Sequence, residues 1–393
     1  MKRCSTVLAL VATLVTTLGV AGPASADAGF PIPDHATVTL EGDGFGHGVG
    51  MSQYGAYGAA RQGLGFKQIL RFYYPGTNLG DTDGQVKVLV SADDRDLVVD
   101  TARGLTVRAL KSGKSWKPAV PRASRWRLVP SGTRTQVSYR TSSWHSWRTV
   151  AGDVQLSAGS RPLTLRTPDG PVAYRGALRS TYRNDSRVTV NVVPMESYVR
   201  GVVPSEMYAS WPQQALRAQA VASRTYAAYE REHTTNTAYD LCDTAACQAY
   251  GGYSAESGAS DDAVAATARK VLTYQGKTAF AQFSASNGGW TVAGQVDKSP
   301  VAYLPAQHDP YEGSSPDYYG WKVDLTTEEI EQAYNLGNLT YLGIETRNDG
   351  GSAGHVLTVR IKTEGGFDDT VTGESFFKHF DLRSTMFKID SVQ

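Results

Sequence analysis

The sequence predicts an α+β fold, with a helical region packed on a mixed or antiparallel sheet and an additional β-rich region. Helix signals gather at 53–73 and 194–270, short β-branched runs fill 85–193, and strands return from about residue 339. Strands and helices that occur in blocks are typical of α+β proteins rather than of alternating α/β folds. Hydrophobic residues make up 41% and charged residues 20% of the 393 residues, which is the composition of a globular chain.

The first 26 residues are expected to be a signal peptide. Lys2 and Arg3 form a basic start, an apolar run follows, and Ala24-Ser25-Ala26 forms an A-x-A cleavage site. The run is shorter than the roughly 20 residues that a spanning helix needs, so we expect a secreted, extracytoplasmic protein with no membrane span after cleavage. Cleavage would move the formal net charge from +1 to −1, and this near-neutral charge argues against a nucleic-acid partner.

Local patterns place the first elements after the signal. A strand is expected at 37–40, leading into a glycine-rich loop. Ser52 can cap a helix over about 53–62, and a second short helix is expected over 66–73.

The β-rich region and the later helices follow from turn and capping signals. Asn184 and Asp185 are expected to join two strands as a hairpin, and Pro194 and Gly201 to begin and end a short helix. The remaining expected elements are a helix over about 212–230, a helix over about 261–270, a hairpin at 275–277, a helix opened by a capping box at 326–329, and strands from about 339.

Four glycines, Gly44, Gly46, Gly48 and Gly50, alternate strictly. Alternation in an extended chain leaves one face without side chains, so that another backbone or a flat ligand can approach closely. His47 would point to the opposite face. It is either a half-buried histidine with its hydrogen bonds satisfied or a group that lines a cleft.

Glu206 is the carboxylate with the most unusual surroundings. Val203 and Pro204 precede it closely and Met207 follows it, and apolar surroundings raise the pKa of a carboxyl group. A glutamate with a raised pKa can act as a general acid near neutral pH. The alternative is a surface glutamate at a helix start, where the helix dipole stabilises its charge.

Gln219 and Arg224 are polar residues on an alanine-rich helix that is expected to be buried. Buried polar groups need hydrogen-bond partners. The two side chains are therefore either internal struts or groups that face a polar ligand.

Cys242 and Cys247 are the cysteines that remain after signal cleavage. In an oxidising compartment they are expected to form a disulfide across a short loop. A zinc site with His233 is the alternative, although only three obvious ligands lie in this segment and zinc usually takes four. Free thiols are the third possibility.

Residues 350–354 match the G-x-S-x-G pattern of serine hydrolases. That motif requires a turn from a strand into a helix, whereas here a strand at 355–361 follows. The segment is interpreted as a hairpin loop, and serine catalysis is not expected.

Three segments together resemble the stage II sporulation protein D / LytB amidase-enhancer (SpoIID/LytB) family. They are the long stretch at 193–227 containing Val-Pro-Ser-Glu206-Met, the Ser-Ala-Ser-Asn-Gly-Gly-Trp-Thr block at 284–291 with Asp309-Pro310, and the Gly-His-Gly-Val-Gly-Met-Ser-Gln-Tyr-Gly block at 46–55. The stretch around Glu206 is highly specific.

The resemblance implies a peptidoglycan lytic transglycosylase, in which Glu206 is the single acid and base. Such an enzyme cuts the MurNAc–GlcNAc bond without water and leaves a 1,6-anhydro-MurNAc end. No second carboxylate, metal or cofactor is expected. The substrate-binding residues that we expect on the matching blocks are His47, Gly48, Gln53, Tyr54, Gln219, Arg224, Ser286, Gly288 and Gly289.

The order of the blocks differs from the family pattern. The glycine-rich block normally lies near the C-terminus and here comes first, so the order resembles a circular permutation. In that case a strand at 37–41 should pair with a strand at 386–390, and His47 should lie within one side-chain layer of Glu206. The expected organisation is a signal peptide (1–26), a linker with the glycine-rich part of the core (27–84), a β-rich region (85–185) and the main SpoIID/LytB-like core (186–393).

The resemblance also implies an alternative function. The chain would then bind the cell wall without cleaving it and stimulate an N-acetylmuramoyl-L-alanine amidase. The expected partners are peptidoglycan glycan strands and, under this alternative, such an amidase. The glutamate is present under either hypothesis.

Overall fold

The protein is described by a computed structural model, which covers residues 29–90, 96–183, 186–313, 318–349, 351 and 353–393. The expected signal peptide lies outside these residues. The described part combines helices with several sheets, which confirms the α+β class. None of the helices within it is both long and apolar enough to cross a membrane.

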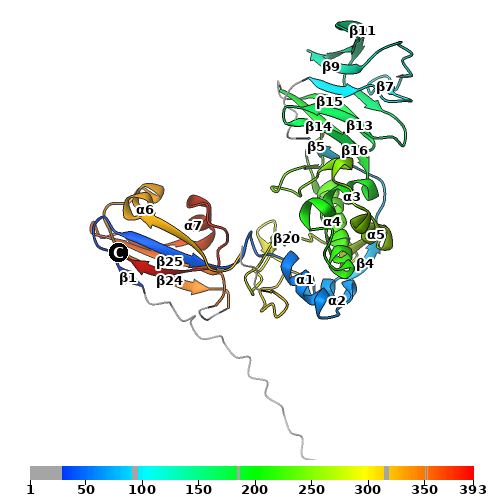
Figure 1. The fold of residues 1–393 in the computed structure, drawn as a ribbon. Helices are drawn as coiled ribbons and strands as arrows, with labels where there is room; N and C mark the ends of the chain where they lie inside the picture. Colours follow the sequence, from blue (N-terminus) through cyan, green and yellow to red (C-terminus); the bar gives the residue numbers. More distant parts are fainter. Residues whose placement is uncertain (1–28, 91–95, 184–185, 314–317, 350, 352) are drawn as a thin grey trace, which may run out of the picture.

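A separate unit contains the C-terminal strands together with the first strands of the chain (Figure 1). Its two sheets have the orders β1-β24-β25-β26 and β23-β2-β27. The bounds are β1 Phe30–Pro31, β2 Thr37–Gly42, β23 Trp321–Thr326, β24 Leu339–Arg347, β25 Val356–Thr363, β26 Asp368–Thr372, β27 Phe387–Val392, α6 Thr327–Tyr334 and α7 Gly373–His379.

The expected pairing of the two ends of the chain is present in this unit. β2 and β27 are antiparallel neighbours, with Leu40 opposite Ile389 and Gly42 opposite Phe387. The unit has its own cluster of buried hydrophobic residues, separate from the larger cluster of the remaining chain. This differs from the single core that we expected over 186–393, because pairing with β2 draws residues 321–392 into a unit of their own.

The β-rich region consists of two antiparallel sheets, except for one parallel pair, β5 with β17. The six-stranded sheet contains β11 Trp144–Ala151, β10 Arg134–Arg140, β9 Arg125–Ser131, β6 Leu97–Asp100, β13 Leu163–Thr167 and β14 Gly170–Tyr174, in that order. The seven-stranded sheet contains β17 Leu241–Cys242, β5 Gln85–Leu89, β16 Ser186–Pro194, β15 Ala177–Arg183, β12 Val154–Ser157, β7 Thr106–Ala109 and β8 Ser115–Trp116. The strands on either side of the expected hairpin, β15 and β16, are antiparallel neighbours with Arg183 opposite Ser186, and residues 184–185 themselves lie outside the described residues.

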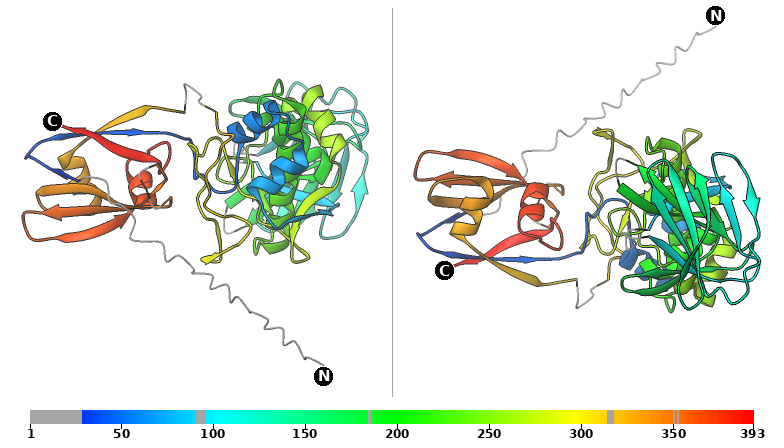
Figure 2. Two further views of the ribbon diagram at one scale, coloured as in Figure 1. Left: turned by 90° about the horizontal axis from the view of Figure 1, so that it is seen from below. Right: turned by 90° about the horizontal axis from the view of Figure 1, so that it is seen from above.

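The helices lie below this region in Figure 1, and loops around β20 connect them to the C-terminal unit, as the views in Figure 2 also show. The helices are α1 Gln53–Arg61, α2 Phe66–Tyr73, α3 Met195–Glu206, α4 Gln213–His233, α5 Gly258–Ala266 and a 3-10 turn at Gly252–Ala255. The short strands are β3 Met51–Ser52, β4 Asn78–Asp81, β18 Lys270–Tyr274, β19 Lys277–Thr278, β20 Phe283–Ser284, β21 Gln295–Val296 and β22 Ser299–Pro300.

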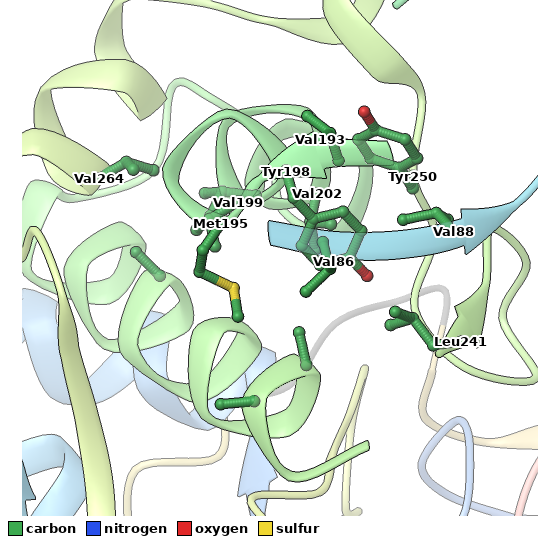
Figure 3. Packing of buried hydrophobic residues seen from close by; sticks show 14 of the residues in the cluster. Val86, Val88, Val193, Met195, Tyr198, Val199, Val202, Leu241, Tyr250 and Val264 are labelled. Atoms are coloured by element: carbon green, nitrogen blue, oxygen red, sulfur yellow. The ribbon is translucent and has the colours of Figure 1, made fainter. Parts of the chain in front are cut away.

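Helix α3 is held against the seven-stranded sheet by buried apolar side chains (Figure 3). Tyr198 and Val202 of the helix are fully buried in the cluster that includes Val86 and Val88 of β5. Tyr250 completes this contact, with its ring centroid 4.9 Å from that of Tyr198. The end of α3 is thereby fixed relative to the β-rich region and to α4.

Candidate active site

Glu206 is the last residue of α3, and Met207 after it is extended. The sequence predicted that this helix ends at Gly201, which was wrong. Gly201 lies where an added Cβ would be 2.6 Å from the Tyr250 ring and 2.7 Å from the Gly252 carbonyl oxygen. The glycine is therefore required for close packing, and the helix continues for five more residues through Pro204 to Glu206.

The Glu206 carboxylate is half-buried and fixed on both oxygens. Oε1 accepts a hydrogen bond from the Ala249 backbone N–H at 2.6 Å, and Oε2 accepts one from Gln53 Nε2 at 3.1 Å. Burial raises the pKa of Glu206 above its ordinary value, while the two hydrogen bonds lower it by a smaller amount. The C-terminal end of a helix also disfavours negative charge, which acts in the same direction as burial.

Gln53 reaches Glu206 from the first turn of α1. Ser52 caps this helix as the sequence predicted, since its Oγ accepts the Gly55 backbone N–H at 3.0 Å. The Tyr54 N–H is bound by the Ala285 carbonyl oxygen at 3.0 Å. The glycine-rich block thus delivers a side chain to Glu206 from a segment 153 residues away in the sequence.

Glu312 is a second carboxylate in this region, and it was not among the residues that the sequence predicted. Its Oε1 accepts a hydrogen bond from Ser286 Oγ at 2.7 Å, and its Oε2 accepts one from Ser52 Oγ. Burial raises the pKa of Glu312 to about 7. No local pattern marks Glu312, because its partners Ser52 and Ser286 lie 260 and 26 residues away in the sequence.

Asp309 is buried and forms hydrogen bonds with residues next to Ser286 and Glu312. It accepts hydrogen bonds from the Tyr73 hydroxyl at 2.7 Å and from Asn287 Nδ2 at 2.8 Å. Its Oδ1 also accepts the Tyr311 backbone N–H at 3.0 Å. Ser286, which we expected to bind substrate, is fully buried between these groups and holds Glu312 instead.

Aromatic side chains surround the residues that follow Glu206 and Gln53. The Tyr54 ring centroid lies 4.8 Å from that of Trp211 and 5.0 Å from that of Tyr318. Tyr208 lies 5.8 Å from Trp211 and is 65% exposed. Phe45, 5.3 Å from Tyr318, is 45% exposed. These rings form the aromatic wall, which presents apolar surface next to a half-buried carboxyl group.

His47 faces a different cavity. Its Nδ1 accepts the Val49 N–H at 2.9 Å, and the ring lines a cavity of about 820 Å³ between the loops and the C-terminal unit, together with His355. Burial lowers the pKa of His47. A Cβ at Gly48, where φ is +70°, would lie 2.8 Å from the His355 ring. We therefore place His47 and Gly48 outside the Glu206 site.

Gly288 and Gly289 are needed for the conformation of the backbone and do not lie in the Glu206 site. Both have positive φ, +66° and +106°, and a Cβ at Gly288 would lie 2.4 Å from the sulfur of Met386. They line a smaller cavity on the side of β27. The structure thus separates four of the expected binding residues from Glu206 and leaves Gln53 and Tyr54 beside it.

Gln219 and Arg224 are internal struts. Both are fully buried in α4. Gln219 donates to Ser223 Oγ at 2.9 Å, and Arg224 forms two hydrogen bonds of 2.8 and 2.9 Å with Glu196 and one of 3.1 Å with the Lys270 carbonyl oxygen. The prediction that these two side chains bind substrate is therefore wrong, because neither has any exposed surface for a ligand.

Cys242 and Cys247 form a disulfide, with their Cα atoms 5.5 Å apart. His233 lies elsewhere, stacked on Tyr229 at 3.9 Å. Within the described ranges, no cluster of three or more His, Cys, Asp or Glu side chains could hold a metal ion. The disulfide closes a loop that ends two residues before Ala249, the backbone donor to Glu206.

Comparison with known proteins agrees with the resemblance seen in the sequence. Residues 183–274 match the family model SpoIID, described as stage II sporulation protein. A stretch of 134 residues is 41% identical to the amidase enhancer of Bacillus subtilis (strain 168) and covers 34% of this chain and 17% of that protein. Stage II sporulation protein D of the same organism is 31% identical over 209 residues, which cover 49% of this chain and 57% of the relative.

The protein of the same name from Bacillus amyloliquefaciens is 29% identical over 201 residues, or 47% of this chain and 55% of the relative. The chain therefore spans between about one sixth and somewhat over half of the length of these relatives. The stretch of this chain that matches the family model contains Glu206 and the helices α3 and α4.

Proposed function

We propose, from the match of residues 183–274 to the SpoIID family model, that the chain is a lytic transglycosylase of peptidoglycan with Glu206 as its acid and base. The observation that carries the proposal is the Glu206 carboxyl group, half-buried at the end of α3 and held by Gln53 and Ala249 beside the aromatic wall. We also propose that the protein acts outside the cytoplasmic membrane, at the cell wall.

The reaction needs one group that first gives and then takes a proton. Protonated Glu206 donates its proton to the glycosidic oxygen between MurNAc C1 and the GlcNAc unit as the C1–O bond breaks and an oxocarbenium-like centre forms. The C6 hydroxyl oxygen of the same MurNAc then bonds to C1, and its proton passes to the Glu206 carboxylate. The products are a 1,6-anhydro-MurNAc end and a free GlcNAc hydroxyl. No water is consumed, and Glu206 is again protonated.

Burial of Glu206 favours the protonated form that begins this cycle, and its two hydrogen bonds favour the carboxylate that forms midway. Sugar rings expose apolar C–H faces, for which exposed tyrosine and tryptophan rings are suitable partners. The aromatic wall is therefore the part of the surface that we assign to the glycan strand. Exclusion of water by these rings would favour attack by the C6 hydroxyl over hydrolysis.

A second candidate function rests on the relative named amidase enhancer, with 41% identity over 134 residues. Under this alternative the chain binds glycan at the same wall of rings and stimulates an N-acetylmuramoyl-L-alanine amidase without cleaving the strand. Glu206 would then only stabilise the end of α3 through its two hydrogen bonds.

Mass spectrometry of the products separates the two functions. The full chain is incubated with peptide-free glycan strands and with intact peptidoglycan, each with and without a purified amidase. The transglycosylase proposal predicts products with anhydro ends, 18 mass units lighter than hydrolysed ends because one water is absent, in the samples without amidase. Intact strands in those samples, together with faster amidase turnover when the chain is added, would instead support the enhancer.

A further inference from the structure

The charge of the chain is distributed unevenly between its parts. Residues 85–194 contain 19 lysines and arginines but only 7 aspartates and glutamates, a formal charge of +12. The rest of the chain contains 20 basic and 31 acidic residues, a formal charge of −11. The near-neutral total thus conceals a strongly basic β-rich region, and such asymmetry indicates a polyanionic partner for that region.

Six cations of this region lie on two neighbouring hairpins. Arg108, Lys111, Lys114 and Lys117 belong to the hairpin of β7 and β8 and the residues after it, and Arg134 and Arg148 belong to the hairpin of β10 and β11. We call these six residues the basic patch.

Three contacts bring the two hairpins together. The Leu110 N–H donates to the Asp153 carbonyl oxygen at 3.0 Å, and Lys111 Cβ is only 3.2 Å from the position of a Cβ at Gly152. The guanidinium carbon of Arg148 lies 4.6 Å from the centre of the Trp116 ring on β8. The cations of the two hairpins therefore share one part of the surface.

The basic patch is available to a ligand. All six side chains belong to exposed residues, and none forms an ion pair with a carboxylate of the described residues. Other cations of the same region are already paired, for example Arg166 with Asp100 at 2.6 Å and Arg175 with Glu256 at 2.5 Å. Exposed like charges repel one another, so a patch of unpaired cations gains from binding an anion.

Aromatic rings lie among these cations. Trp116 and Trp147 are 6.2 Å apart between ring centroids, and the Arg148 guanidinium lies over both rings, at 4.6 and 4.9 Å. Both tryptophans are partly exposed and lie on β8 and β11, each of which is one of the two edge strands of its sheet. Flat apolar rings beside Lys and Arg suit a ligand that alternates carbon-rich units with anionic groups.

We propose that the basic patch binds a wall polymer in which phosphodiesters alternate with polyol or sugar units. Lysines and Arg148 contact the phosphates, and the indole rings of Trp116 and Trp147 contact the carbon-rich units. The patch would hold the protein on the wall through a surface distinct from Glu206. The choice of a wall polymer rather than a nucleic acid rests on the location given under the proposed function.

The test is sedimentation of the full chain with purified cell walls that carry poly(glycerol phosphate), before and after hydrofluoric acid removes the phosphodiester-linked polymer. The patch variant is Lys111→Glu/Lys114→Glu/Arg148→Glu. The matched control reverses three exposed lysines outside the patch, Lys67→Glu/Lys277→Glu/Lys298→Glu. We expect the patch variant to bind untreated walls at least tenfold more weakly, the control to stay within threefold of wild type, and acid treatment to weaken wild-type binding to the level of the patch variant.

Arg148 packs on two rings, so a second variant, Lys111→Gln/Lys114→Gln, tests the charge without changing that contact. It makes two of the six units of charge change of the patch variant, so the logarithm of its affinity should fall by about a third as much. Equal wild-type binding to treated and untreated walls would overturn the proposal. Double-stranded DNA that competes better than poly(glycerol phosphate) at equal phosphate concentration would overturn the choice of polymer. Cleavage of phosphate-free glycan by the patch variant should equal that of wild type, so failure of the patch and failure of the transglycosylase proposal are distinguishable.

Discussion

Glu206 is held between opposing effects on its charge. Burial and the C-terminal helix end favour the neutral carboxyl group, whereas the Ala249 N–H and the Gln53 amide favour the carboxylate. A substitution that removes one of these hydrogen bonds should change the pKa of Glu206 while the carboxyl group itself stays in place.

We predict that Gln53→Ala raises the pKa of Glu206 further, because the lost donor stabilised the charged form. The acid must be protonated to begin the reaction, so activity falls as pH rises through its pKa. The alkaline limb of kcat/KM should therefore move to higher pH in the variant. The measurement is a pH profile of anhydro-product formation. Gln62→Ala, at the exposed end of α1, should leave the profile unchanged. A shift of the limb to lower pH would contradict the assignment.

Glu312 gives a prediction about stability. Its pKa is raised from 4.5 to about 7 in the folded protein, so between these values the folded state keeps a proton that the unfolded state has lost. The free energy of unfolding should therefore fall as pH rises from about 4.5 to 7, by up to about 3 kcal/mol from this group. Glu312→Gln cannot ionise and should lack this component.

Urea unfolding gives the free energy of unfolding of wild type and of Glu312→Gln at pH 4.5 and at pH 8. The effect of Glu312 is the loss of wild type between the two pH values minus the loss of the variant. Glu364→Gln, an exposed change outside the site, serves as control. A Glu312→Gln variant that loses as much stability over this range as wild type does would show that folding does not raise the pKa of Glu312.

At the scale of elements, the disulfide loop is tied to the site through its backbone. The Cys242–Cys247 bond precedes Ala249, whose N–H holds Glu206. We predict that Cys242→Ser/Cys247→Ser loses about 2 kcal/mol of stability, the value for so short a loop, and several-fold activity, because Ala249 is held less firmly. Thermal melting and product formation measure both, and wild type treated with a reductant should behave in the same way. Full activity without the bond would show that the loop holds its position unaided.

The elements also show how far the sequence could predict this structure. Signals carried by adjacent residues gave the Ser52 cap, the capping box that begins α6, and the hairpins, because the interacting groups lie within a few residues of one another. The end of α3 was wrong because Gly201 is fixed by contact with Tyr250, which is remote in sequence.

The same reason explains what the sequence missed at the site. Glu312 is recognisable only through Ser52, 260 residues away, and Ser286, 26 residues away. Arg224 looked equally suited to bind ligand or to act as a strut until Glu196 was placed beside it. Glu206 was found because a specific local motif surrounds it.

At the scale of the whole molecule, the described residues form two hydrophobic clusters, one of them confined to the C-terminal unit. Separate cores predict two transitions in calorimetry. Phe376 is fully buried in the smaller cluster. Phe376→Ala should reduce the free energy of unfolding of that unit by roughly 3–5 kcal/mol, and it should therefore lower the melting temperature of that transition alone. Anhydro-product formation should persist at a temperature between the two transitions only if that unit is dispensable for catalysis. A single transition that moves as a whole would show instead that the two clusters unfold together.

The pairing of β2 with β27 agrees with a permuted order of the family blocks, since it joins the two ends of the chain in one sheet. The permutation itself stays a prediction. So does the proposal that a basic β-rich region and an acidic remainder divide wall attachment and glycan cleavage between them.

If Glu206 is the acid and base of the reaction, Glu206→Gln removes the one proton that both steps transfer. Glutamine keeps the size and hydrogen-bonding capacity of the side chain but has no transferable proton, and general acid–base catalysis contributes roughly 10²–10⁴-fold. We predict a loss of anhydro-product formation of that order by mass spectrometry, with the melting temperature and glycan binding close to those of wild type and of Glu364→Gln. Activity of a folded Glu206→Gln protein within about threefold of wild type, which is under 1 kcal/mol of barrier, would contradict the account.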